Sequence, residues 1–63
     1  MMGKLNGYAS RLLDNGYTWF DTCYENAEGV INAAKTKGYT DIKAVRVRTD
    51  TPGLKMYVVL VKE

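Results

Sequence analysis

The hydrophobic pattern is densest between Lys55 and Lys62, where the chain reads Lys-Met-Tyr-Val-Val-Leu-Val-Lys. A run of this length that is rich in β-branched and aromatic residues favours a strand over a helix. Side chains alternate along a strand, so the odd-numbered residues of this run face one way and the even-numbered residues face the other. Both sets are apolar at positions 56–61, which predicts a strand in the interior of a small sheet, with a neighbouring strand on each side.

Helical periodicity appears twice. The first pattern predicts a helix from Lys4 to Asp14, which Asn15-Gly16 ends because both residues tolerate a left-handed cap conformation. The second predicts a helix from about Glu25 to Lys37, capped by Gly38. The two apolar stripes consist of Leu5, Tyr8, Ala9, Leu12 and Leu13, and of Ala27, Val30, Ile31 and Ala34.

The segment from Tyr17 to Tyr24 fits two structures. Its composition is typical of a strand, whereas its periodicity continues into the second helical stripe and fits a helix start. We favour the strand because Asn-Gly-Tyr-Thr at positions 15–18 is echoed by Lys-Gly-Tyr-Thr at 37–40, and both segments follow a predicted helix. A strand here also supplies the second neighbour that the last strand needs.

The segment from Ile42 to Thr49 alternates as a half-buried strand does. Val45 and Val47 share one face, and Ala44, Arg46 and Arg48 share the other. Asp-Thr-Pro-Gly at positions 50–53 predicts a turn, since proline presets the first corner and glycine accepts positive φ at the second. The last two strands therefore form a hairpin.

These elements predict a single α+β domain over residues 1–63, with the order helix, strand, helix, strand, strand. A crossover connection makes the first two strands parallel, and the last strand fits between them. The expected sheet is three-stranded and mostly antiparallel with strand order 1-3-2, and we expect both helices on one face. The alternative is two helices packed on a C-terminal β-hairpin, a winged-helix-like arrangement in which residues 18–24 are helical.

Composition excludes several kinds of chemistry. The 63 residues include one cysteine, Cys23, and no histidine, so no internal disulfide can form and we expect neither a metal nor a cofactor. The chain has almost no residues that could form a nucleophile and its general base, so we expect the protein not to be an enzyme. A single cysteine, no leading apolar segment and no run of about 20 apolar residues predict a cytoplasmic protein outside the membrane.

A sheet with helices on one face leaves its other face open. We expect Trp19, Tyr57 and Val59 to form an apolar patch there, bordered by Arg46 and Arg48. The sequence thus favours a small binding module that docks on a protein partner and regulates it. The partner is either a second copy of the chain, giving a homodimer, or a larger enzyme or assembly.

The alternative partner is nucleic acid, bound by the basic C-terminal hairpin. Its candidate residues are Lys43, Arg46, Arg48 and Lys55, because cations on a β-ribbon can contact phosphates. The competing interpretation is a solvated outer face whose charges protect a sheet edge. A net charge of +2 neither requires nor excludes nucleic acid.

Overall fold

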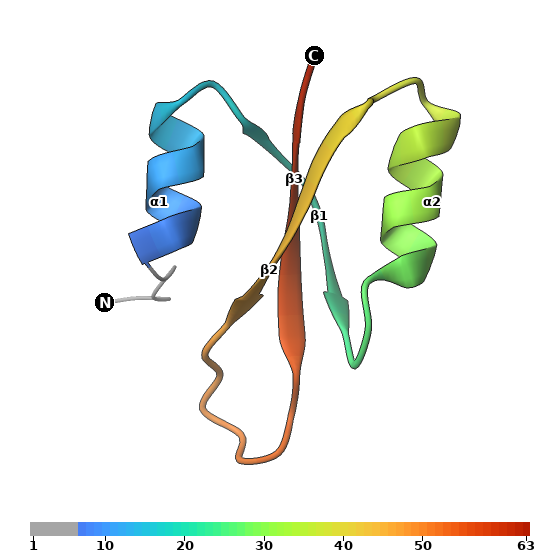
Figure 1. The fold of residues 1–63 in the computed structure, drawn as a ribbon. Helices are drawn as coiled ribbons and strands as arrows, with labels where there is room; N and C mark the ends of the chain where they lie inside the picture. The colour runs from blue at the N-terminus through green and yellow to red at the C-terminus, as the bar shows by residue number, and fades with distance from the viewer. Residues whose placement is uncertain (1–6) are drawn as a thin grey trace.

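The computed structural model describes residues 7–63, which form two helices and one three-stranded sheet (Figure 1). Residues 4–6 of the first predicted helix lie outside the described residues. The elements in chain order are α1 (Gly7–Asp14), β1 (Thr18–Tyr24), α2 (Glu28–Thr36), β2 (Asp41–Val47) and β3 (Met56–Lys62).

The strand order β1-β3-β2 confirms the predicted topology. β3 pairs antiparallel with both neighbours, Thr22 lying opposite Val58 on one side and Val45 opposite Val58 on the other. β1 and β2 therefore run parallel to each other, joined by the crossover through α2. A strand bonded on both sides has no free edge, so the most apolar segment of the chain is also the best protected from water.

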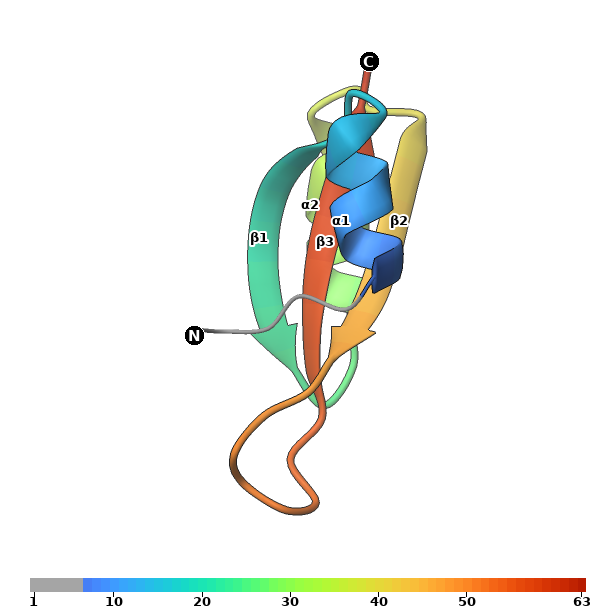
Figure 2. The same cartoon turned by 90° about the vertical axis from the view of Figure 1, so that its left-hand side faces the viewer.

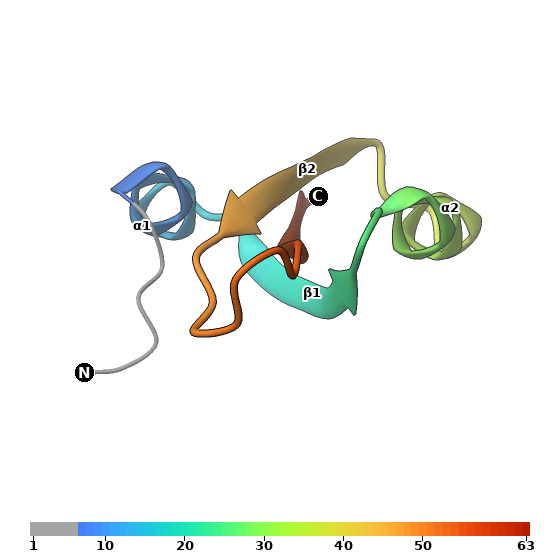
Figure 3. The same cartoon turned by 90° about the horizontal axis from the view of Figure 1, so that it is seen from below.

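The prediction that both helices cover one face is wrong. α1 lies on one side of the sheet and α2 on the other, as Figures 2 and 3 show from two directions. The reason lies in β3, whose residues Val58 to Val61 are at most 1% exposed although they alternate between the two faces. Each face must bury an apolar row, and one helix per face achieves this within a single chain.

The α1 face of the sheet contains the main core cluster. Ala9 and Leu12 of α1 pack there against Val45, Val58 and Leu60. Ala9 is fully buried within this cluster. Full burial of a valine or leucine side chain contributes about 1.5–3 kcal/mol, so these contacts hold a helix of only eight residues in place.

The α2 face has its own core. α2 lies against all three strands, and Ala34 is fully buried. Val59 and Val61 of β3 are 0% and 1% exposed on this face. The rings of Phe20 and Tyr39 meet edge to face with centroids 5.9 Å apart, a favourable geometry that closes one end of this layer.

The segment from Thr18 to Tyr24 is a strand, so the alternative with only a two-stranded hairpin is wrong. α2 begins at Glu28 rather than near Glu25, because the chain must first reverse direction. Glu25 adopts φ 72° for this reversal, and the Asn26 side-chain oxygen accepts a hydrogen bond from the Glu28 amide at 3.2 Å.

The hairpin turn forms as predicted. Pro52 and Gly53 occupy its two corners, Gly53 has φ +82°, and the Leu54 amide donates to the Thr51 carbonyl at 3.2 Å. These features correspond to a type II turn, whose second corner requires positive φ.

Candidate functional site

The exposed large apolar side chains share one side of the sheet. Within the described residues these are Tyr8, Trp19 and Tyr24, which are 50%, 49% and 56% exposed. Other large apolar residues, such as Leu12 and Leu60, are buried. We call Tyr8, Trp19 and Tyr24 the aromatic surface.

A bulge in β1 places Trp19 and Tyr24 on the same face. Trp19 lies opposite Leu60 and Tyr24 lies opposite Met56, and both partners belong to the α1 face. Simple alternation would put residues 19 and 24 on opposite faces. The register shifts between Trp19 and Asp21, where β1 contains one extra residue. This residue changes the alternation by one position, so that Trp19 and Tyr24 face the same side of the sheet.

The indole of Trp19 is held in position. Its Nε1 donates a hydrogen bond to Thr22 Oγ1 at 3.1 Å, and Thr22 lies between Trp19 and Tyr24 on the same face. The polar edge of the ring is therefore satisfied within the protein while about half of the side chain stays in water. An aromatic side chain fixed in this way loses little conformational freedom on binding, which favours contact with a partner.

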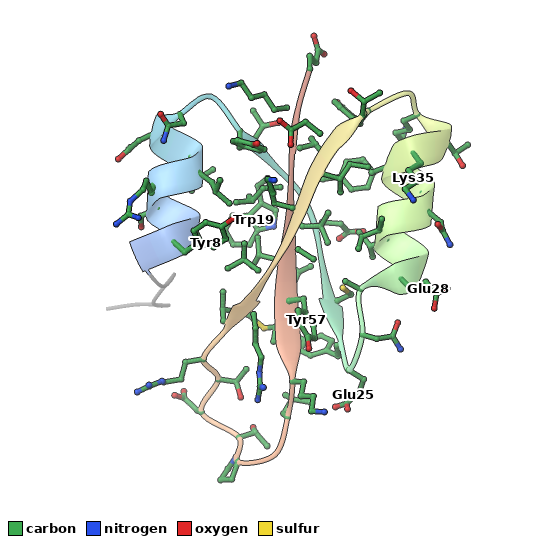
Figure 4. All side chains as sticks on the ribbon, in the orientation of Figure 1. Tyr8, Trp19, Glu25, Glu28, Lys35 and Tyr57 are labelled. Atoms are coloured by element: carbon green, nitrogen blue, oxygen red, sulfur yellow. The ribbon has the colours of Figure 1, made fainter. Side chains whose placement is uncertain are left out.

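Tyr8 approaches the same side from α1. Figure 4 shows its side chain leaving α1 toward the sheet, on the side where Trp19 lies. Each aromatic side chain carries about 150–250 Å² of surface, so the half-exposed rings present on the order of 300 Å². Patches of roughly this size are often functional in small monomers.

The direct cross-strand neighbours of Trp19 and Tyr24 are apolar. Thr22 is the third residue of β1 on this face, and the β3 residues opposite these three are Leu60, Val58 and Met56. The side chains directly across the sheet from these three β1 residues are therefore uncharged.

The structure does not bring the predicted interface residues together. Trp19 lies on the α1 face, whereas Tyr57 shares the α2 face with Arg46, its cross-strand partner. Val59 is fully buried and belongs to the core, so its prediction as a contact residue is wrong. The physical reason is that α2 covers the face that was expected to be open.

Tyr57 lies beyond the N-terminal end of α2, toward the hairpin (Figure 4). It is half-buried in a row that crosses the sheet from Cys23 through Tyr57 to Arg46. Burial raises the pKa of the Cys23 thiol, and the nearby Asp21 carboxylate raises it further. The thiol is therefore protonated at neutral pH, a state in which cysteine is a poor nucleophile.

The predicted basic residues are only partly gathered. Arg46 and Arg48 line an open hollow of about 370 Å³ beside the hairpin turn. Lys43 lies opposite Leu60 on the α1 face, whereas Arg46 is on the α2 face, and Lys43 Nζ is 3.9 Å from Asp41 Oδ1. Lys55 is exposed at the base of the hairpin, where its carbonyl accepts a hydrogen bond from the Glu25 amide at 2.7 Å.

A polar cluster ties the connection between α1 and β1 to the rest of the sheet. The Tyr17 hydroxyl donates to Asp41 Oδ2 at 2.7 Å, and Lys62 Nζ lies 5.5 Å from the centre of the Tyr17 ring. The hydrogen bond to Asp41 raises the pKa of Tyr17, and partial burial raises it further, because both disfavour the phenolate. This cluster fixes the path by which α1 reaches its face.

Tyr8 and Tyr24 were not among the predicted contact residues. Their position on a common face depends on the β1 bulge and on the position of α1. No local pattern in the sequence marks either feature.

Comparison with known proteins gives no matching family model, no similar curated protein and no similar solved structure. None of the described helices combines the length and apolar character needed to cross a membrane. Residues 7–63 also contain no group of three acidic, cysteine or histidine side chains arranged to bind a metal ion. The candidate site is therefore defined by the geometry of the aromatic surface alone.

Proposed function

We propose that this chain is a small, non-enzymatic binding module that docks on a partner protein through the aromatic surface and thereby regulates it. One observation carries the proposal: Tyr8, Trp19 and Tyr24 are about half exposed and belong to one side of the sheet. Tyrosine and tryptophan dominate the energetic centres of protein interfaces, because they bury a large area at a small cost in side-chain entropy.

The apolar cross-strand neighbours of Trp19 and Tyr24 favour a protein over nucleic acid at this site. Bases can stack on exposed aromatic rings, but such sites also carry cations that follow the phosphate backbone. Thr22, between Trp19 and Tyr24, is uncharged, as are the β3 residues opposite them. An apolar protein surface therefore complements the aromatic surface better than a polyanion does.

Affinity capture tests this proposal. The chain is immobilised and exposed to an extract of its source cells, in parallel with the double variant Trp19→Ser/Tyr24→Ser and the control variant Lys35→Ala. Lys35 is exposed on α2, the helix of the opposite face. We expect a discrete partner to bind the unchanged chain and Lys35→Ala, and its recovery on the double variant to fall at least tenfold. Equal recovery on all three would refute the proposal.

The second candidate function is nucleic-acid binding by the hairpin. The observation that favours it is the hollow that Arg46 and Arg48 line together. Phosphate contacts of this kind weaken steeply as salt rises. A band-shift titration at low and moderate salt, with Arg46→Gln/Arg48→Gln as the variant, tests it. Absence of a shift at low salt removes nucleic acid as a partner.

A further inference from the structure

The two edges of the sheet differ in how they are protected. β1 carries a bulge between Trp19 and Asp21, which interrupts its ladder and discourages pairing with another strand. β2 keeps continuous register with β3 from Asp41 to Val47, without a bulge or a proline. The outer edge of β2 is therefore the regular one.

No described element lies beyond β2. Figures 2 and 3 show that α1 and α2 cover the two faces of the sheet and leave the outer side of β2 uncovered. The main-chain N–H and C=O groups that point outward from this strand can be satisfied by water or by another extended chain. A regular edge of seven residues is a template for an added strand.

The charges along β2 select among extended partners. Lys43 flanks the edge on the α1 face and Arg46 flanks it on the α2 face, with Arg48 just beyond the strand. Asp41 is the one acidic residue of this segment. Its carboxylate accepts a hydrogen bond from the Tyr17 hydroxyl at 2.7 Å, and its contact of 3.9 Å with Lys43 is exposed and contributes little. Three cations and one anion leave this segment with a net charge of +2.

A second copy of the chain fits this edge poorly. Pairing β2 with itself would bring two segments of like charge together, and lysine on a strand edge is a common means of preventing such pairing. An acidic segment, in contrast, can form ion pairs with the same cations. Lys43 and Arg46 are three residues apart, so acidic residues three apart in an antiparallel strand would lie beside them on the two faces.

We infer that β2 binds an extended acidic segment of a partner protein, which adds to the sheet as a fourth strand. This site lies on the opposite edge from Trp19 and Tyr24 and does not depend on the aromatic surface. Backbone hydrogen bonds supply the pairing, and the two cations supply the preference for acidic side chains.

Capped eight-residue peptides test the inference by nuclear magnetic resonance. The probe has two glutamates three positions apart and threonine or valine elsewhere. One control replaces both glutamates by lysine, and the other replaces a central residue by proline, which removes a backbone donor. We expect the glutamate peptide to shift the amide signals of Asp41–Val47 saturably and to slow their hydrogen exchange, with both controls at least tenfold weaker.

A charge-swap variant sharpens the test. Lys43→Glu/Arg46→Glu should reverse the preference and bind the lysine peptide at least tenfold more tightly than the glutamate peptide, with the dispersed spectrum showing that it remains folded. Three results would overturn the inference. These are no saturable shift in β2 at millimolar peptide, equal binding of the proline peptide, and tighter binding of a single-stranded oligonucleotide by the same residues.

Discussion

The packing of β3 between two helices makes a quantitative prediction about neighbouring residues. Leu60 and Val59 are adjacent in sequence, and both are 0% exposed. Leu60 packs with residues of α1, and Val59, the next residue along the strand, faces the opposite side of the sheet, where α2 lies. If each helix buries its own face of the sheet, truncating either residue to alanine should leave a cavity. A sheet covered on one face only would make just one of the two substitutions severe.

The magnitudes follow from the groups removed. Leu60→Ala deletes three buried carbon groups and should cost about 2–5 kcal/mol. Val59→Ala deletes two groups, which contribute about 0.8 kcal/mol each before any cavity term, so the cost should be about 1.6 kcal/mol or more. A chain of 63 residues has a total stability of about 3–9 kcal/mol, so Leu60→Ala should leave the protein partly or wholly unfolded.

Urea denaturation followed by far-ultraviolet circular dichroism measures both costs. Lys35→Ala serves as the control, since an exposed substitution changes the free energy of unfolding by less than about 0.5 kcal/mol. A Val59→Ala variant that is indistinguishable from this control, beside a severely destabilised Leu60→Ala, would show that the α2 face is not packed. The arrangement of the helices on opposite faces would then be incorrect.

Three further predictions concern single groups. The pKa of Tyr17 is higher in the folded state than in the unfolded chain, so its contribution to the free energy of unfolding is present below pH 10 and is lost as the pH rises through the folded pKa. Tyr17→Phe should therefore flatten the decline of the thermal midpoint at alkaline pH. An unchanged decline would contradict this reasoning. The Cys23 thiol should react with iodoacetamide at pH 8 more slowly than a cysteine in an unstructured peptide, and an equal rate would contradict its raised pKa. Gly53→Ala should cost about 1 kcal/mol in urea denaturation, because φ +82° is strained for a residue with a side chain, and no loss would contradict the turn assignment.

Much of the fold follows from patterns that the sequence displays. β3 could be placed in the centre of the sheet because six successive apolar residues demand cover on both faces. The hairpin turn followed from Pro52-Gly53, whose chemistry allows few conformations. These constraints are local, and local constraints can be recognised in a single sequence.

The position of α1 was not predictable in the same way. Only Asn15 to Tyr17 separate α1 from β1, and nothing in that connection indicates which face the helix covers. The hydrogen bond from Tyr17 to Asp41 joins residues 24 positions apart, so it becomes visible only once the sheet has formed.

The candidate site depended on an equally non-local feature. Without the β1 bulge, Trp19 would share the α2 face with Cys23 and Tyr57, which is the grouping that alternation suggests. The extra residue moves Trp19 to the α1 face, beside Tyr24 and away from Tyr57. Bulges have no reliable signature in a single sequence, and one residue of register changes which side chains share a surface.

Photo-crosslinking in the source cells tests the central claim most directly. A benzophenone side chain is introduced at position 19, at position 24 or, as the control, at position 35 on α2. We predict a discrete heavier adduct from positions 19 and 24 and none from position 35, with the adduct's mass distinguishing a second copy of this chain from a different protein. Adducts from position 35 alone, or none from positions 19 and 24, would contradict docking through the aromatic surface.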